Sequence, residues 1–492
     1  MSIDREAEIN PAMSPEMSPA TCPVYVDLDD TLISTDMLWE SMCFLACQRP
    51  ASALGLPFWL LRGKAGFKRA IAERVSFDPA LLPYRAEVLE YLREAKASGR
   101  RLVLATASDS GLAEPIAAHL EIFERVLASD GETNLSGKTK LDAIRGDCDG
   151  SDFEYLGNSA ADVPIWRAAA VATLVQPSAG AARAAESFEG SVKQIETARP
   201  GLGPMLKSMR SYQWIKNALL WVPLLLAHQL SNAQKVSQVA IAFACFCAIA
   251  SATYIFNDLL DIESDRRHER KCKRPFAAGT LPISDGVLLM LALMLGGFGL
   301  SFSALPLVST GMLAIYTVLT ISYSFILKQK LFLDVLVLAG LFTHRVLAGA
   351  VAAEVRLSPW LLAFCMFMFL SLALLKRYAE LLATEDGGGA SNRRRAYEVS
   401  DLGMVETMGL AAGYMAVLVL CLFVTSDDVS KLYPRPNVLW LIMPPILYWV
   451  SRMWLLARRK ILLDDPVMFA AVDRTSWLTG VVVVLVAVIA AY

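Results

Sequence analysis

Apolar residues are distributed unevenly along this 492-residue chain. Residues 1–200 have the mixed composition of a soluble domain. Residues 215–492 instead contain repeated apolar runs of about 20 residues, the length that an α-helix needs to cross a bilayer. The runs fall at 215–230, 236–255, 286–303, 307–326, 332–352, 359–375, 407–425, 437–456 and 477–491. The pattern therefore predicts a soluble N-terminal domain followed by an all-α polytopic membrane bundle of nine transmembrane helices.

Charged residues near the predicted spans indicate their orientation. With the N-terminus inside, the inner loops contain seventeen lysines and arginines and the outer loops contain four. Because basic loops stay in the cytoplasm, we expect an integral protein of the bacterial inner membrane, with a cytoplasmic N-terminal domain and the C-terminus outside. The totals of 46 basic and 48 acidic residues are close to balance, which gives no indication of nucleic-acid binding.

The soluble part has recognisable boundaries. Residues 1–21 lack the cationic and apolar regions of a signal peptide, and we expect them to be disordered. A domain is predicted over 22–195. The Pro/Gly-rich sequence RPGLGP indicates a linker at 196–206, and the membrane domain follows at 207–492.

Polar residues follow three predicted strands in this first domain. The segment CPVYVDLDDTLISTD predicts a strand that ends at Asp27, with Asp29 two residues later. One carboxylate so placed can attack phosphorus while the second handles protons. RLVLATAS predicts a second strand, ending at Thr106, and FEYLGNSAADVPIW a third, ending at Asn158. Strands that alternate with helices predict a parallel sheet, with its site at the carboxyl ends of the strands.

This ordered set resembles the haloacid dehalogenase-like phosphatase superfamily, over roughly residues 22–195. The resemblance implies an α/β Rossmann-like fold in which Asp27 is the nucleophile and Asp29 the general acid and base. It also implies phosphoryl-binding and Mg²⁺-binding groups. Thr106 and Lys140 would bind the phosphoryl group, with Lys140 preferred to Lys138, and Asp27, Asn158 and Asp162 would hold Mg²⁺.

Two features of this domain leave alternatives open. Asn158 stands where the family commonly has an acidic residue, so weaker metal binding, a slower enzyme or a degenerate scaffold domain are alternatives. Between Asp29 and Thr106 lie 76 residues, and about 36–90 resemble a helical cap over the site. Within them Trp39, Phe58 and Trp59, near Arg62 and Lys64, could also touch the membrane surface.

A second acidic motif follows the second predicted span. Residues 257–279 read NDLLDIESDRRHERKCKRPFAAG. On a helix, Asp258, Asp261 and Asp265 would share one face, because they are spaced at i, i+3 and i+7. Crowded carboxylates repel one another unless a cation neutralises them, and such oxygen ligands suit Mg²⁺ bound to a diphosphate. Ionisable residues at membrane depth indicate a functional site.

Other polar residues accompany this motif. Arg345, within an apolar run, is expected to need an anionic partner or cavity water. His344 beside it is interpreted as a helix-packing residue. Candidates for binding the substrates are Lys216, Asn257, Lys273, Arg274, Tyr323, Lys328, Asp334 and Arg345.

The motif NDxxDxxxD followed by KRPxxxG resembles the UbiA superfamily of intramembrane prenyltransferases, over roughly residues 205–492. The resemblance implies that Asp258, Asp261 and Asp265 bind Mg²⁺ and a substrate diphosphate. Typical members have a second DxxxD cluster, whereas here Leu338 stands four residues after Asp334. The segments RSYQWIKNALLWVPLL, YSFILK, DVLVLAGLFTHRVLAGA, LSPWLL and KRYAEL are most similar to the decaprenyl-phosphate phosphoribosyltransferase branch.

That branch implies transfer of 5-phosphoribose from phosphoribosyl pyrophosphate to polyprenyl phosphate, on the way to arabinofuranosyl donors for the cell envelope. The first domain would then remove the 5-phosphate. One alternative is transfer of a prenyl group from prenyl diphosphate to an aromatic or lipid acceptor, and another is a non-catalytic membrane scaffold or transporter. Membrane lipid is an expected partner, and the sequence leaves homo-oligomerisation open.

Overall fold

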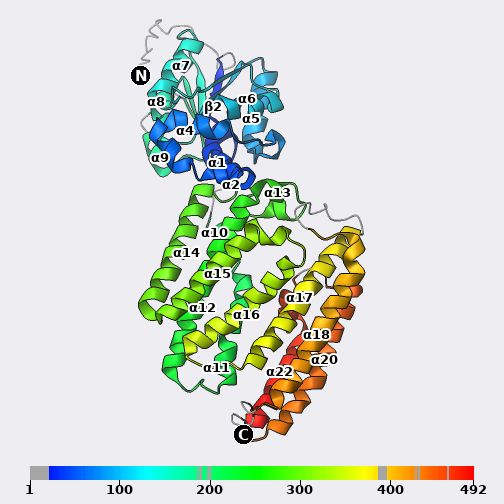
Figure 1. Cartoon of the computed structure of the whole chain (residues 1–492). Helices are drawn as coiled ribbons and strands as arrows, with labels where there is room; N and C mark the ends of the chain where they lie inside the picture. The colour runs from blue at the N-terminus through cyan, green and yellow to red at the C-terminus, as the bar shows by residue number, and fades with distance from the viewer. Residues whose placement is uncertain are drawn as a thin grey trace, which may run out of the picture. The chain divides into compact units, whose positions relative to one another are not determined.

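The computed structural model describes residues 22–185, 188, 191–196, 201–385, 396–426, 429, 433–462 and 465–491. The predicted disordered segment 1–21 and residues 197–200 of the predicted linker lie outside this set. The chain forms two compact units (Figure 1). Unit 1 comprises Met1–Met205 and Asp258–Gly286, and unit 2 comprises Leu206–Asn257 and Val287–Tyr492.

Unit 1 is built on a six-stranded parallel sheet, as the alternation of strands and helices predicted. Its order is β3-β2-β1-β4-β5-β6, so β1 lies in the interior of the sheet. The pairing aligns Val26 of β1 with Leu104 of β2 and Leu156 of β4. The strands are β1 Val24–Val26, β2 Leu102–Asp109, β3 Arg125–Ser129, β4 Glu154–Gly157, β5 Val171–Val175 and β6 Ser191–Ile195.

Alternate residues of the strands pack on opposite faces of the sheet. Val24 and Val26 belong to the core beneath α5 (Ala86–Ala97) and α6 (Ser110–Leu120). Tyr25 belongs to the core beneath α7 (Lys138–Asp147), α8 (Val163–Trp166) and α9 (Ala179–Ala185). Figure 1 shows these two groups of helices on either side of β2. Both faces are covered, and the interior strands β1 and β5 are therefore almost entirely apolar, whereas the edge strand β6 is largely exposed.

Short helices fill the insertion between β1 and β2. They form a separate apolar cluster around Leu45, Phe67 and Ile71. The predicted cap extended to residue 90, but α5 begins at Ala86 and packs Val88 and Leu92 against the sheet. The elements before it are η1 Leu28–Leu32, α1 Met37–Gln48, α2 Pro50–Ala53, α3 Leu56–Trp59, η2 Leu60–Arg62, α4 Gly63–Ala72 and η3 Pro79–Leu81.

A buried ion pair joins the two chain segments of unit 1. Arg266, the last residue of α13 (Ile262–Arg266), donates from both terminal nitrogens to the carboxylate of Glu40 in α1. Its Nε donates to the carbonyl of Ala277 at 3.0 Å. The side chains of Arg266 and Glu40 are 5% and 0% exposed. The pair is therefore shielded from water, and neither partner can be removed without leaving a buried charge.

Unit 2 is helical, and the long helices run side by side (Figure 1). Among the described residues, eight helices are long and apolar enough to cross a membrane. These are Ala233–Leu260, Ile283–Ala304, Leu307–Phe325, Leu333–Ala353, Pro359–Glu385, Val399–Val424, Pro436–Arg458 and Arg474–Ala491. Their cores are α12, α14, α15, α16, α17, α18, α20 and α22. α12 and α14 each cross a unit boundary and so join the two units covalently.

The first of the nine predicted spans, 215–230, is not among these helices. It is divided into a 3₁₀ stretch, η5 Ser211–Trp221, and a short α11, Val222–Leu226. Pro223 lies in the first turn of α11, where its missing N–H costs nothing, and it cannot continue the preceding helix. His228, with a φ of 55°, then turns the chain. Hydropathy alone does not detect such interruptions.

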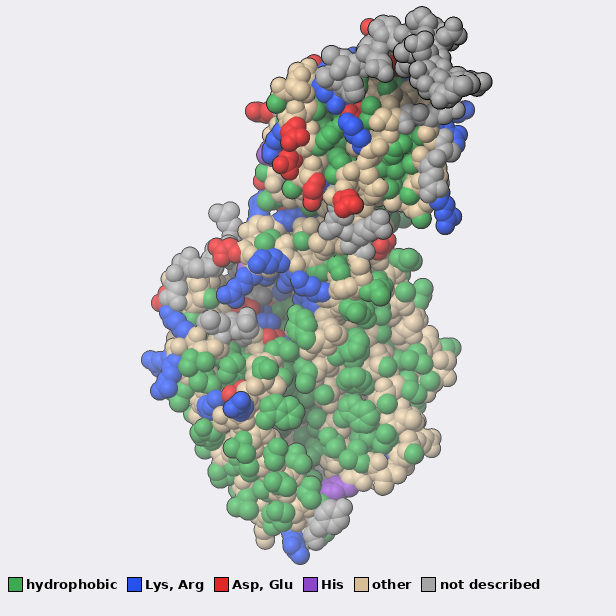
Figure 2. Space-filling view, turned by 180° about the vertical axis from the view of Figure 1, so that it is seen from behind, with side chains coloured by type: hydrophobic (Ala, Val, Ile, Leu, Met, Phe, Trp, Pro, Cys, Tyr) green, Lys and Arg blue, Asp and Glu red, His purple; other side chains and the backbone are tan. Residues whose placement is uncertain are grey.

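Small residues let these helices approach closely. A Cβ added to Gly349 of α16 would lie 2.0 Å from the carbonyl oxygen of Leu220 in η5, and one added to Gly409 of α18 would lie 2.1 Å from Trp454. Close backbone approach of this kind is typical of packed membrane helices. On the outside, Leu288, Leu295 and Phe302 of α14 are at least 70% exposed. Hydrophobic side chains cover much of the helical surface in Figure 2, as a lipid-facing surface requires.

The buried cluster around Glu154 gives a stability prediction for unit 1. Glu154 accepts from Arg100 at 2.7 Å and from Tyr91 and Thr173 at 2.6 Å, and it is 0% exposed. We expect Glu154→Ala to destabilise unit 1 by about 3 kcal/mol or more, because the buried Arg100 loses its counter-ion. Thermal resistance of unit 1 to limited proteolysis in the detergent-solubilised chain measures the effect. Glu90→Ala on the exposed face of α5 is the control, and an equal midpoint for both variants would contradict the prediction.

Candidate functional site

Two acidic residues directly follow β1 in unit 1. Asp27 accepts a hydrogen bond from the Leu28 amide at 2.9 Å. Asp29 accepts from the Met37 amide at 2.7 Å and from the Ser108 hydroxyl at 2.8 Å. Asp30 adopts a φ of 53° within η1, so the chain turns sharply between the strand and the cap. Asp27 therefore lies at the carboxyl end of β1, and Asp29 contacts both Ser108 of β2 and the first residue of α1.

Lys140 lies between two carboxylates. Its Nζ is 3.0 Å from Asp27 Oδ1 and 3.8 Å from Asp162 Oδ1, and it donates to the Tyr155 hydroxyl at 3.0 Å. Lys140 is 2% exposed, whereas Lys138 is exposed. Of the two candidate lysines, Lys140 is therefore the one that the fold brings to Asp27.

Burial dominates the titration of this cluster. It raises the pKa of Asp27 to about 6, although the nearby Lys140 opposes the shift. It raises the pKa of Asp29 to about 8, and the charges of Asp36 and Asp27 add to the shift. For Lys140, burial would lower the pKa, but the Asp27 and Asp162 carboxylates raise it further. At neutral pH Asp27 is mainly ionised and Asp29 mainly protonated.

The other predicted phosphoryl-binding and metal-binding residues lie at the same edge of the sheet. Thr106 is fully buried, and its hydroxyl accepts from the Ser108 amide at 3.0 Å. Asp162 Oδ2 accepts from the amides of Asn158 and Ser159 at 3.2 and 2.9 Å, and its Oδ1 accepts from the Tyr155 hydroxyl at 2.8 Å. These bonds fix Asp162 beside Lys140.

Sequence reasoning missed some groups at this site. Lys68 of α4 donates to the Ala107 carbonyl at 2.6 Å and to Asn134 at 3.0 Å. Burial lowers its pKa, while the Asp29 charge acts against the shift. Ser108, two residues after the predicted end of the second strand, was given no role. Nothing in the sequence indicates that Lys68, within the insertion, reaches the end of β2.

A cavity of about 1230 Å³ lies within unit 1 and includes Asn158 in its lining. Its other polar lining residues include Asp30, Arg85, Gln176 and Ser178. Its volume is sufficient for a small molecule, and its polar groups can form hydrogen bonds with hydroxyls or phosphates.

The residues proposed to hold Mg²⁺ in unit 1 offer only oxygen donors. Asp27 and Asp162 supply carboxylates, and Asn158 supplies an amide. Within the described part of the chain, no three His, Cys, Asp or Glu side chains are grouped as a metal site. The proposed set contains only two carboxylates, and its third member is an amide. Hard oxygen donors beside an anion-binding lysine fit Mg²⁺.

The second acidic motif is bent rather than continuous. α12 (Ala233–Leu260) ends before Asp261, which precedes α13, and the Asp265 amide donates to the Asp261 carbonyl at 2.8 Å. Asp258 and Asp265 nevertheless converge, because Arg274 Nη1 is 3.1 Å from one and 2.6 Å from the other. Burial raises the pKa of Asp265, which Arg274 opposes. Asn257 precedes Asp258 in α12, and Lys273 ends η6 (Lys271–Lys273) next to Arg274.

Among the described residues the three motif aspartates do not form a group that could hold a metal ion, but Asp258 and Asp265 converge on one positive charge. Two carboxylates already direct oxygens at one nitrogen of a guanidinium group, so a positive charge is stabilised at that point. We had expected Arg274 to assist a phosphate. The structure instead shows Arg274 bound to the motif aspartates, so Mg²⁺ at this point would require Arg274 to move. Carboxylate oxygens are the ligands that Mg²⁺ prefers.

In unit 2, Arg345 is buried among neutral oxygens. It donates to Asn217 Oδ1 and to the Tyr316 hydroxyl, both at 2.9 Å, and to the Leu341 carbonyl at 2.8 Å. The expectation of a phosphate or an acidic side chain is not met by these bonds. Three neutral acceptors instead take three of the five guanidinium N–H groups. His344 contacts the Met312 carbonyl at 2.9 Å, which agrees with its interpretation as a packing residue.

Two further charged clusters contain the remaining candidates. Lys216 pairs with Asp465 at 2.5 Å, and Lys376 lies 3.7 Å from the same carboxylate. Arg377 pairs with Asp334 at 2.5 Å and donates to Tyr323 at 2.9 Å. Lys328 lies in η7 (Leu327–Gln329). The sequence reasoning had assigned no role to Asp465, Lys376 or Arg377, because their partners are distant in sequence.

Comparisons with known proteins agree with this architecture. Residues 218–470 match the UbiA prenyltransferase family, and residues 24–167 match haloacid dehalogenase-like hydrolase. An uncharacterized protein, y4nM, of Sinorhizobium fredii is 35% identical over 94% of this chain and 89% of its own length. Nodulation protein NoeC of Azorhizobium caulinodans is 35% identical over 55% of this chain and 87% of its own. Decaprenyl-phosphate phosphoribosyltransferase of Corynebacterium glutamicum is 38% identical over 43% of this chain and 65% of its own.

The Lys140 cluster gives a pH-dependent stability prediction. We expect Lys140→Met to destabilise unit 1 by about 3 kcal/mol or more at pH 7.5, because two buried carboxylates lose their cation. Without Lys140 the folded pKa of Asp27 rises above its present value of about 6, so the loss should shrink as the pH falls and Asp27 is protonated. Limited proteolysis at pH 7.5 and 5.5 measures this. The exposed Lys138→Met is the control, and a loss independent of pH would contradict the assignment.

Proposed function

Because the chain belongs to the UbiA prenyltransferase family and carries a haloacid dehalogenase-like hydrolase domain at its N-terminus, we propose a bifunctional enzyme. It transfers 5-phosphoribose from phosphoribosyl pyrophosphate to a polyprenyl phosphate and then removes the 5-phosphate. The observation that carries the proposal is the 38% identity to a decaprenyl-phosphate phosphoribosyltransferase over 216 residues. The fused hydrolase domain would act on the phosphate that this transfer leaves on the ribose.

In the first reaction, an oxygen of the polyprenyl phosphate bonds to C1 of the ribose, and the bond from C1 to pyrophosphate breaks. Asp258, Asp261 and Asp265 are the proposed Mg²⁺ ligands. The metal would neutralise the charge that develops on the leaving pyrophosphate. Asn257 and Lys273 would assist the phosphates of the donor, and Arg274 would join them once it leaves Asp258 and Asp265. Lys216, Tyr323, Lys328 and Arg345 would orient the acceptor phosphate or the ribose phosphate. Asp334 would hold Arg377 beside Tyr323.

In the second reaction, an Asp27 oxygen attacks phosphorus and the bond to the ribose 5-oxygen breaks. Asp29, protonated at neutral pH by virtue of its raised pKa, donates its proton to that oxygen. Asp29 then accepts a proton from the water that hydrolyses the aspartyl phosphate. Lys140 and Thr106 hold the phosphoryl oxygens, and Asp27, Asn158 and Asp162 are the proposed Mg²⁺ ligands.

The proposal includes a location and a product. The protein lies in the bacterial inner membrane with unit 1 in the cytoplasm, where phosphoribosyl pyrophosphate is available, and with the C-terminus outside. Its product is a polyprenyl-phosphoryl ribose, which suits a precursor of arabinofuranosyl donors for the cell envelope.

Direct analysis of the lipid products tests both steps. The purified chain is incubated with phosphoribosyl pyrophosphate, polyprenyl phosphate and Mg²⁺, and the lipids are identified by mass spectrometry. We expect Asp27→Asn to accumulate the lipid that retains the 5-phosphate, and Asp261→Ala to abolish transfer. Asp142→Asn, on the exposed side of α7, is the control for both.

Other outcomes distinguish the rival functions. An unchanged dephosphorylated product in Asp27→Asn would show that the hydrolase domain is a scaffold. Transfer of label from prenyl diphosphate to an aromatic acceptor would favour an ordinary prenyltransferase. Retained cellular function of Asp261→Ala would favour a non-catalytic scaffold or transporter.

The raised pKa of Asp29 predicts the alkaline limb of the phosphatase pH profile. Activity should fall as Asp29 loses its proton near pH 8. Asp27 is expected to stay ionised throughout this range in the active enzyme, because the charge of the Mg²⁺ proposed to bind it would lower its pKa. With an activated aryl phosphate, whose leaving group needs no proton, Asp29→Asn should still release a single-turnover burst of the aryl alcohol, and the rate of that burst should lose the alkaline limb. Its steady-state turnover should be lost, because Asp29 also activates the water that hydrolyses the aspartyl phosphate. Initial rates from pH 5 to 9 check this, and an alkaline limb that persists in Asp29→Asn would assign it to another group.

A further inference from the structure

We propose that unit 1 binds the surface of an anionic lipid bilayer through an apolar patch on its cap. The patch consists of Leu54, Phe58, Leu60 and Leu61, which are 78%, 72%, 60% and 86% exposed. Leu54 lies in the turn after α2, Phe58 in α3, and Leu60 and Leu61 in η2. Four large apolar side chains so exposed within eight residues mark an interaction surface.

The patch is presented by a packed segment. Leu56 and Trp59, between the exposed residues, pack against the apolar cluster of Leu45, Phe67 and Ile71. The Arg74 guanidinium lies 4.8 Å from the centre of the Trp59 ring and holds it from the other side. Leu56 and Trp59 therefore face the cap interior, while the four patch residues around them face the surroundings. Because the inward residues anchor the segment, its exposed residues stay outside the core.

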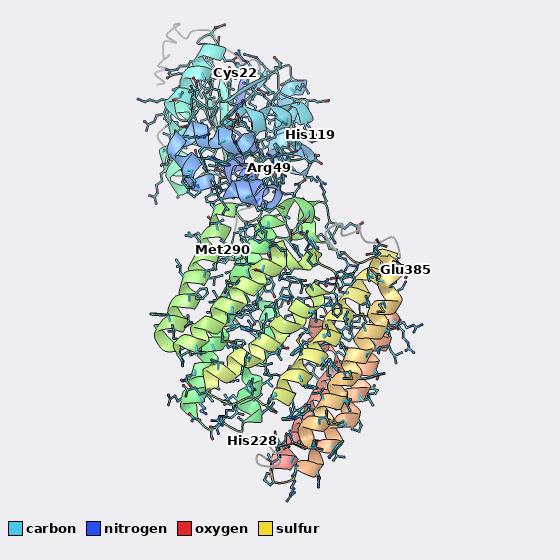
Figure 3. All side chains as sticks on the ribbon, in the orientation of Figure 1. Cys22, Arg49, His119, His228, Met290 and Glu385 are labelled. Carbon is cyan, nitrogen blue, oxygen red and sulfur yellow. The ribbon has the colours of Figure 1, made fainter. Side chains whose placement is uncertain are left out.

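The basic residues around the patch favour an anionic partner. Arg49, Arg62 and Lys64 are exposed and flank the apolar residues, and residues 49–64 contain no aspartate or glutamate. Figure 3 labels Arg49 on this part of unit 1. Apolar side chains that enter the headgroup region, with basic side chains beside them, are typical of segments that lie on anionic bilayers. The helices here have only three or four residues, far too few to span a bilayer.

The chain itself also keeps unit 1 close to a bilayer. Unit 1 includes Asp258–Gly286, the connection between α12 and α14, and both of these helices are candidate membrane spans. Unit 1 is thus attached to the membrane by its own chain, and weak lipid contacts gain from a high effective concentration. For a lipid-linked substrate, such contact would favour access to the Asp27 site. That consequence rests on the proposed function, whereas the lipid contact itself does not.

Site-specific photo-crosslinking in the full chain tests the contact. p-Benzoylphenylalanine is placed at position 58 or 61 in place of Phe58 or Leu61, or at position 90 on the exposed face of α5 as a control. The protein is reconstituted in phosphatidylcholine vesicles with or without phosphatidylglycerol, irradiated and analysed by mass spectrometry. We expect lipid adducts at positions 58 and 61, at several-fold higher yield than at position 90 and higher still with phosphatidylglycerol.

Each other outcome overturns the proposal. Adducts with peptides of the same chain would mean that the rest of the protein covers the patch, and adducts with a second copy would mean an oligomer interface. A lipid yield equal to that at position 90 would mean no contact. Arg62→Glu combined with Lys64→Glu should lower the yield in phosphatidylglycerol vesicles, and an unchanged yield would refute the anionic preference. None of these side chains contributes to the Asp27 or Asp258 clusters, so loss of catalytic activity in the parent chain leaves this test interpretable.

Discussion

A charged side chain that is removed from water needs a compensating charge or several hydrogen bonds. This requirement decides which charged residues lie together in the interior of both units. In unit 1, the Lys140 ammonium makes it feasible for Asp27 and Asp162 to lie close together at the carboxyl edge of the sheet. In unit 2, the Arg377 guanidinium pairs with the buried carboxylate of Asp334. Without these cations the carboxylates would be protonated or exposed. The charged groups of the proposed sites therefore also stabilise the fold.

The order of the polar residues was sufficient to predict which of them gather at one edge of the sheet in unit 1, and the family resemblance supplied their proposed roles. Asp27, Thr106 and Asn158 each follow an apolar run, and parallel strands bring such positions to one edge. Which of Lys138 and Lys140 faces Asp27 depends on the rotation of their helix about its axis, and in the structure Lys140 is the buried one. Lys68 could not be predicted, since its position depends on how the cap folds back over β2.

In unit 2 the apolar pattern predicted where helices lie better than what their polar residues contact. Hydropathy measures how apolar a segment is but not whether its backbone is continuous, and for this reason the interruption at Pro223 was missed. Arg345 was expected to need an anion because isolated burial of a charge is unfavourable. The acceptors Asn217 and Tyr316 are far from it in sequence, and a single sequence does not reveal such pairs.

The ion pair between Glu40 and Arg266 has an evolutionary consequence. A flexible fusion can be cut at the gene level, because each half keeps its own interior. Here a truncation before residue 206 would remove Glu40 together with α1, so the Arg266 guanidinium would lose its partner and gain water at the same time. A single substitution of Glu40 in the full chain is the more severe change, because it leaves Arg266 buried without its counter-ion. The residue tolerated at position 40 therefore depends on the one 226 positions later.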